Sequence, residues 1–62
     1  MNSLPLPEKI RRFRSLNGIS QESFARKLGV GWNSVQRWES GKVLPSHLGM
    51  SALSKFIEDI YE

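Results

Sequence analysis

Glycine placement constrains this chain more than any other feature of its sequence. Gly18, Gly29, Gly31 and Gly41 leave segments between them of about three helical turns or fewer. Glycine ends helices readily, because without a Cβ atom it adopts the left-handed conformation that follows a helix. Apolar residues recur three and four positions apart, and no stretch alternates cleanly as a half-buried strand would. The sequence therefore predicts an all-α fold, a compact domain of four or five short helices.

The first predicted helix runs from Pro7 to about Leu16 and follows an N-terminal arm at residues 1–6. Proline is favoured in the first helical turn, and Asn17-Gly18 supplies the stop. The inward stripe of this helix consists of Ile10, Phe13 and Leu16. The remaining surface is expected to be basic and is formed by Lys9, Arg11, Arg12 and Arg14.

Two shorter helices are predicted next. Ser20 is a favourable N-cap for the second helix, which ends at Gly29. Its apolar face consists of Phe24, Ala25 and Leu28. The third helix lies between Gly31 and Gly41 and buries Val35 and Trp38, because residues three apart share a helix face. The side chains left facing outward are Trp32, Asn33, Gln36 and Arg37.

A last helix is predicted across about residues 46–60, opened by Pro45 and Ser46. Gly49 allows this helix to be interrupted or to begin later in the sequence. The apolar band of this helix consists of Leu48, Ala52, Leu53, Phe56, Ile57 and Ile60. The 62 residues include no cysteine, and we find no linker or internal repeat. We therefore expect a single domain, residues 1–62, that is held together by helix packing rather than by disulfides.

The segment from Ser20 to Gly41 has the form of a helix-turn-helix, because only Gly29-Val30-Gly31 separates its two helices. In such a motif the first helix lies across a DNA backbone and the second enters the major groove. The outward polar residues of the third predicted helix would then contact DNA. The alternative is that they form an ordinary solvated helix face.

Charge is distributed unevenly along the chain. Residues 1–45 carry eight basic and three acidic side chains, a balance of +5, whereas residues 46–62 carry one basic and three acidic side chains, a balance of −2. This asymmetry favours a basic surface that meets an anionic polymer. The alternative is that the total net charge of +3 only keeps a small protein soluble.

The residues from Ile10 to Phe56 resemble the phage repressor and Cro type of helix-turn-helix, the XRE-like regulators with a lambda-repressor-like fold. The resemblance is carried by Gly18-Ile19-Ser20-Gln21-Glu22-Ser23-Phe24-Ala25, Leu28-Gly29-Val30, Val35, Trp38-Glu39-Ser40-Gly41-Lys42 and Pro45. It implies a regulator that binds double-stranded operator DNA, usually as a dimer on two-fold symmetric sites, and most often a repressor. Some members of this family serve instead as antitoxins or partner-binding modules.

The resemblance also implies roles for individual residues. The base-reading set is Trp32, Asn33, Gln36 and Arg37. The phosphate-contacting set is Gln21, Ser34 and Lys42, and Gln21 is further implied to steady the neighbouring base-reading residue. We add Arg11 to the phosphate-contacting set as a basic side chain of the first helix, with a solvated surface position as the alternative. The guanidinium of Arg37 can reach both acceptors of a guanine, and the amide of Asn33 can pair with both edge groups of an adenine.

Two residues depart from the family pattern. Gly31 stands where many members have a Ser or Thr cap that touches phosphate, so one side-chain phosphate contact is lost. Trp32 stands where a polar side chain usually contacts a base. Its indole could pack on a thymine methyl group or a sugar edge, anchor a protein partner, or pack locally.

Two further sets have structural roles in this interpretation. The resemblance pairs Arg14 with Glu39 as an ion pair between the first helix and the end of the third, with a phosphate contact by Arg14 as the alternative. Met50, Ile57 and Tyr61, spaced seven and four apart, form a second stripe on the last predicted helix. That stripe suits a homodimer contact, or it covers the edge of a small core.

Several functions are not expected. We find no nucleophile paired with a base, no metal-ligand cluster around the single His47 and no phosphate-binding loop, so we expect neither an enzyme nor a cofactor, metal or small-molecule substrate. No apolar run approaches 18 residues, and no signal peptide is visible, so we expect a soluble cytoplasmic protein without a membrane partner. A protein-interaction module that has kept this fold is the alternative to a DNA-binding regulator.

Overall fold

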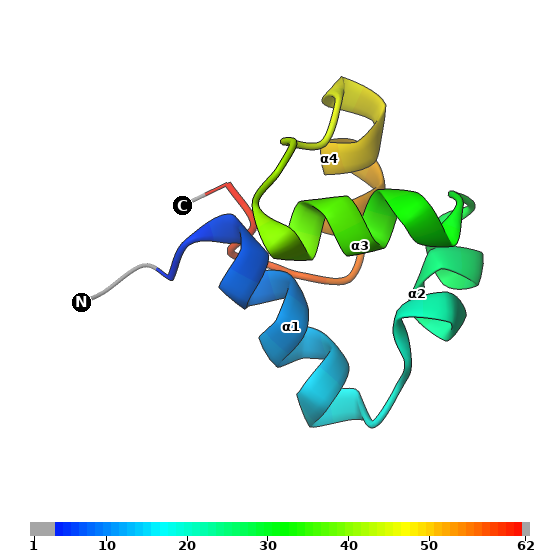
Figure 1. Ribbon diagram of the computed structural model, residues 1–62. Helices are drawn as coiled ribbons and strands as arrows, with labels where there is room; N and C mark the ends of the chain where they lie inside the picture. The colour runs from blue at the N-terminus through cyan, green and yellow to red at the C-terminus, as the bar shows by residue number, and fades with distance from the viewer. Residues whose placement is uncertain (1–3, 62) are drawn as a thin grey trace.

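The computed structural model describes residues 4–61, and the expectation of an N-terminal arm falls partly on residues 1–3, outside that range. The described residues form four α-helices and no strand, which confirms the all-α prediction. The helices are α1 (Leu6–Asn17), α2 (Gln21–Leu28), α3 (Trp32–Ser40) and α4 (His47–Ser54). Helix α3 crosses the middle of the view in Figure 1, with α4 above it and α1 and α2 below.

Helices α2 and α3 begin and end where the sequence predicts. The Ser20 hydroxyl accepts a hydrogen bond of 3.0 Å from the Ser23 amide and caps α2. Helices α1, α2 and α3 each end at a glycine with positive φ, at Gly18 (63°), Gly29 (79°) and Gly41 (78°). A side chain at these positions would be strained, so glycine fixes the length of each helix.

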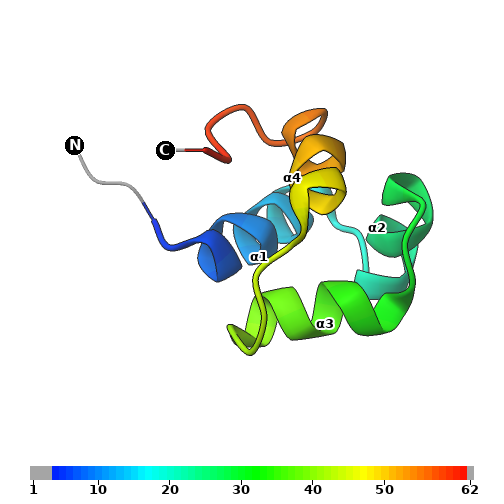
Figure 2. The ribbon, with the colours of Figure 1, turned by 90° about the horizontal axis from the view of Figure 1, so that it is seen from above.

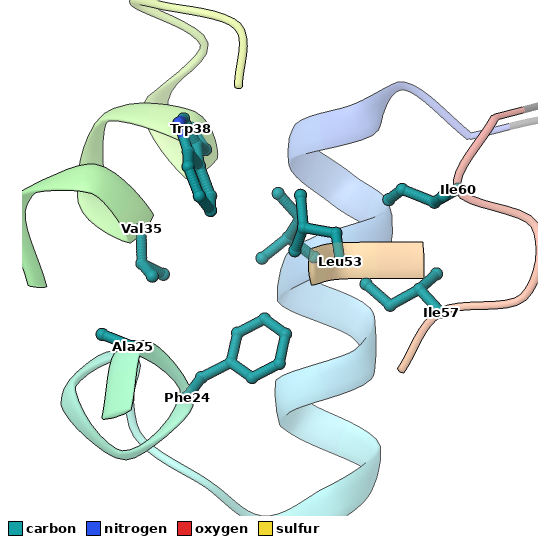
Figure 3. Packing of buried hydrophobic residues seen from close by; sticks show 8 residues of the cluster. Phe24, Ala25, Val35, Trp38, Leu53, Ile57 and Ile60 are labelled. Carbon is teal, nitrogen blue, oxygen red and sulfur yellow. The ribbon is translucent and has the colours of Figure 1, made fainter. Parts of the chain in front are cut away.

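The hydrophobic core lies between the helices (Figure 3). Its buried residues are Ile10, Phe24, Ala25, Val35, Trp38, Leu53, Ile57 and Ile60. Phe24 also contacts two aromatic rings at the edge of the core, since the rings of Phe13, Phe24 and Phe56 meet with centroids 5.2 to 6.1 Å apart. Every helix and the C-terminal segment contribute to the core, and packing of Val35 and Trp38 within it fixes the orientation of α3.

The prediction of a helix reaching about residue 60 is wrong. Helix α4 ends at Ser54, and residues 55–61 form turns that run back across α1 (Figure 2). Two interactions hold them there: Ile60 is buried in the core, and the ammonium of Lys9 donates a hydrogen bond to the carbonyl of Asp59. A straight continuation of α4 would not return the chain to α1.

The shortened helix also corrects the predicted dimer stripe. Met50 lies on α4, but Ile57 lies beyond the end of that helix and is buried in the core, while Tyr61 is exposed in the C-terminal turns. The three residues therefore do not form one helical stripe.

Three further side chains differ from their predicted positions. Leu16 was expected in the inward stripe of α1 and Leu48 in the apolar band of α4, yet they are 75% and 80% exposed. Both lie near a helix end, where a small core has no neighbouring layer to cover them. Lys9, expected on the surface, is buried because the C-terminal turns cover it.

Gly49 lies in the first turn of α4 and allows that helix to approach α3 closely. A Cβ atom there would lie 3.0 Å from Pro45 Cβ and 3.1 Å from the Trp38 ring. Ser46 caps the helix, with its hydroxyl accepting a hydrogen bond of 3.2 Å from the Gly49 amide. Gly49 therefore serves close packing within a helix and does not break it.

Replacing Gly49 with alanine should destabilise the fold although alanine is the better helix former. Overpacking costs about 1–3 kcal/mol, and the higher helix propensity of alanine returns at most about 1 kcal/mol. We expect a net loss of about 1 kcal/mol in the free energy of unfolding, measured by urea denaturation. Ser51→Ala, at an exposed position of the same helix, is the control and should not lower stability. A Gly49→Ala protein as stable as the parent would contradict the close approach.

Candidate nucleic-acid interface

Helix α3 lies along one edge of the molecule, with the other helices on its inner side (Figure 2). Val35, Trp38 and Glu39 face inward and are buried. Successive helical residues rotate by about 100°, so the outward side chains occupy a continuous arc of roughly 140°. The exposed residues on this arc are Trp32, Gln36, Ser40, Asn33 and Arg37. We call these five residues the outer face of α3.

A buried ion pair fixes α3 to α1. The carboxylate of Glu39, whose side chain is 5% exposed, accepts hydrogen bonds from Arg14 Nε at 2.6 Å and Nη2 at 2.8 Å. Arg14 Nη1 donates a third hydrogen bond, of 3.1 Å, to the carbonyl of Ile19, in the loop before α2. This pair is the one that the resemblance implied. Hydrogen bonding to Glu39 raises the pKa of Arg14, so the guanidinium stays charged.

Gln21, the first residue of α2, joins the same cluster. Its amide NH2 donates to Glu39 Oε1 at 3.1 Å, and its amide oxygen accepts from the indole nitrogen of Trp32 at 3.1 Å. The side chain thus connects the buried carboxylate to the outer face of α3. It also contacts Trp32, the neighbouring candidate base-reading residue, as the resemblance implied.

The candidate phosphate-contacting residues lie at different places around α3. Ser34 is half-buried, Lys42 is exposed just after the end of α3, and Gln21 is half-buried at the start of α2. Arg11 belongs to α1, and its side chain reaches the C-terminal end of α3. Its guanidinium donates a hydrogen bond to the carbonyl of Glu39 and contacts the Glu8 carboxylate at 3.3 Å. Arg11 is therefore already engaged within the protein, which the sequence did not indicate.

The exposed charge around α3 is positive. Glu39 is the acidic residue of residues 31–42, and its carboxylate is buried against Arg14. Arg37 and Lys42 are the basic residues of this segment, and both are exposed. An anionic polymer that approaches the outer face of α3 would thus meet positive charge without a competing exposed carboxylate from the same segment.

Two features of this surface were missed at the level of sequence. Ser40 lies on the outer face of α3, and the four-residue spacing from Gln36 was the signal that could have indicated it. The resemblance implied a contact between Gln21 and its neighbour on α3, but not that the indole N–H of Trp32 would be the donor, because Trp32 departs from the family pattern.

Within residues 4–61, no group of three or more His, Cys, Asp and Glu side chains could hold a metal ion. None of the helices described is long and apolar enough to span a bilayer.

Residues 10–58 match the protein family described as helix-turn-helix. The match covers most of the chain and includes α2, α3 and their connection. It confirms the resemblance found in the sequence.

Two curated relatives and one solved structure are similar to this chain. It is 35% identical over 49 residues to the HTH-type transcriptional activator BcrR of Enterococcus faecalis, covering 79% of this chain but only 24% of that protein. It is 35% identical over 60 residues to an uncharacterised HTH-type transcriptional regulator of Methanocaldococcus jannaschii, covering 90% of this chain and 91% of the relative. The fold is similar to the DNA-binding domain of the P22 C2 repressor, with a TM-score of 0.79 and 29% identity over 94% of this chain and 76% of that one.

Removing Arg14 should destabilise the protein strongly. In Arg14→Met, the Glu39 carboxylate would remain buried without its cation, and we expect a loss of about 3 kcal/mol in the free energy of unfolding, measured by urea denaturation. Arg12→Met, an exposed arginine on the same helix, is the control and should change stability by less than about 0.5 kcal/mol.

The double variant Arg14→Met/Glu39→Met separates the ion pair from the volume of the two side chains. Because an apolar pair can replace a buried ion pair at little cost, it should recover much of the lost stability. Equal losses in Arg14→Met and Arg12→Met would refute a structural role for the pair.

Proposed function

Because this chain belongs to the helix-turn-helix family, we propose that it is a sequence-specific transcriptional regulator that places α3 in the major groove of double-stranded DNA. The observation that carries the proposal is the outer face of α3. Its five side chains are polar or aromatic and exposed, while the opposite side of the same helix is fixed by the core and by Glu39. The major groove is wide enough to admit one α-helix.

The exposed side chains suggest a division of labour. Arg37 and Asn33 have the donor and acceptor groups to read guanine and adenine, with Gln36 between Trp32 and Ser40 on the same face. Lys42 and the second amide hydrogen of Gln21 would position the protein on phosphates, together with Ser34. Arg11 would contribute to phosphate binding only through the part of its guanidinium left free by Glu8 and Glu39.

We further propose that the regulator acts mainly as a repressor in the cytoplasm, by occupying promoter DNA. A domain bound across a promoter excludes other proteins from the same groove and backbone. The likeness to a repressor domain supports this direction, whereas the relative named as an activator supports only the general role in transcription.

The proposed DNA-binding form is a homodimer. Leu44 and Leu48 are 79% and 80% exposed, and they lie on the α3–α4 connection and the first turn of α4. A second copy packed here would cover these apolar side chains, and the connection leads directly from α3. This face replaces the stripe of Met50, Ile57 and Tyr61.

The proposed readout predicts different effects for two basic residues. Selection from a random duplex library should first give an enriched sequence. Arg37→Ala should then relax preference at one base pair, with a loss of about 1–3 kcal/mol of discrimination there. Lys42→Ala should weaken binding to all sequences alike and reduce the slope of log affinity against log salt by about one. Fluorescence anisotropy at several salt concentrations measures both effects.

Lys55→Ala is the matched control for charge. Lys55 follows the C-terminal end of α4, which lies away from α3 in Figure 2. Its replacement by alanine should therefore leave the base preference and the salt slope unchanged. An unenriched library, or equal effects of all three substitutions, would favour a protein-interaction module over a DNA-binding regulator.

The proposed dimer face predicts that Leu48→Glu raises the dimer dissociation constant, because it places charge in an apolar contact. Sedimentation equilibrium measures the change, and circular dichroism checks the fold. Leu16→Glu, which alters an equally exposed leucine on α1, should leave self-association unchanged. A parent protein that remains monomeric when bound to its selected duplex would overturn this part of the proposal.

A further inference from the structure

Trp32 carries a polar group that is already used inside the protein. The indole N–H is the one hydrogen-bonding group of a tryptophan side chain. In this structure it donates to the Gln21 amide oxygen at 3.1 Å. The residue is nevertheless 45% exposed, so what it presents to a ligand is carbon.

The orientation of the Gln21 amide follows from its two partners. The Glu39 carboxylate only accepts hydrogen bonds and therefore requires the NH2 group, and the indole only donates and therefore requires the oxygen. Reversing the amide would break both bonds. Glu39 is in turn held by two hydrogen bonds from Arg14. The position of the indole is thus determined by a chain of interactions that ends in the buried ion pair.

We propose that Trp32, held by the contact with Gln21 that the resemblance implied, reads the 5-methyl group of a thymine by apolar contact. The proposal rests on the proposed function, since it specifies what one residue of the outer face of α3 recognises. Trp32 is the first residue of that helix, and the N-terminal residues of a recognition helix reach base edges.

The choice of thymine follows from the chemistry of the major groove. Base edges there present nitrogen and oxygen donors and acceptors, and the 5-methyl group of thymine is the apolar group among them. An indole whose N–H is occupied gains nothing from a donor or an acceptor and leaves such a group without a partner. Contact with a methyl group instead buries apolar surface from both molecules.

The test uses the duplex enriched in the library selection. Each thymine is replaced in turn by deoxyuridine, which removes the methyl group and leaves the base pair intact. For the parent protein we expect affinity to fall about fourfold at one thymine of each half-site, the effect of one buried methyl group. Replacement at thymines away from α3 should leave affinity unchanged.

Variants test the role of each residue through the ratio of affinities for the thymine and deoxyuridine duplexes. This ratio cancels any general loss of binding. Trp32→Phe keeps an apolar ring and should retain a ratio well above one, whereas Trp32→Gln should lower it to about one. Gln21→Met keeps a similar shape without the amide, so the indole loses its fixed position and the ratio should fall toward one.

The outcomes separate this inference from the proposed function. An enriched sequence that depends on Arg37 but shows no deoxyuridine effect would overturn the methyl contact and leave the regulator intact. A ratio unchanged in Gln21→Met would overturn the positioning role of Gln21. A library without enrichment would overturn the proposed function and the inference together.

Discussion

The buried carboxylate of Glu39 is the constraint on which the rest of the structure depends. A buried charge is costly unless opposite charge and hydrogen bonds compensate it. Here Arg14 of α1 and Gln21 of α2 supply that compensation, while Glu39 itself belongs to α3. One side chain therefore requires three helices to meet at a single point. A hydrophobic core tolerates small shifts of these helices, whereas the bidentate hydrogen bonds between Arg14 and Glu39 require a fixed geometry.

This constraint gives the two sides of α3 different roles. The inner side is held by Val35, Trp38 and Glu39, and the five side chains of the outer face are exposed. Because close approach of α4 at Gly49 also fixes Trp38, the helix is supported along its length from within. A rigid helix with a free polar face is suited to recognition, since little conformational entropy is lost when it binds.

Much of this arrangement could be predicted from the sequence, because local signals encode it. The glycines and the Ser20 cap define α2 and α3, and the spacing of Val35 and Trp38 identifies the buried side of α3. The end of α4 and the burial of Lys9 could not be predicted, because both depend on the C-terminal turns packing on a distant helix. The Arg14–Glu39 pair followed only from the resemblance. The assignments of base and phosphate contacts stay predictions, since they concern contacts with DNA rather than contacts within the chain.

Under the proposed function, the Gln21–Trp32 contact would connect the stability of the fold to its specificity. A tryptophan at the start of α3 is unusual for a polar recognition surface, yet its indole N–H has a partner that Glu39 holds in place. The cluster that orients α3 thus also sets the chemistry of one residue on its outer face. It follows that changes at Arg14 or Glu39, neither of which lies on that face, should alter which bases are preferred as well as how stable the protein is. Specificity in this domain would then be a property of the helix together with its support.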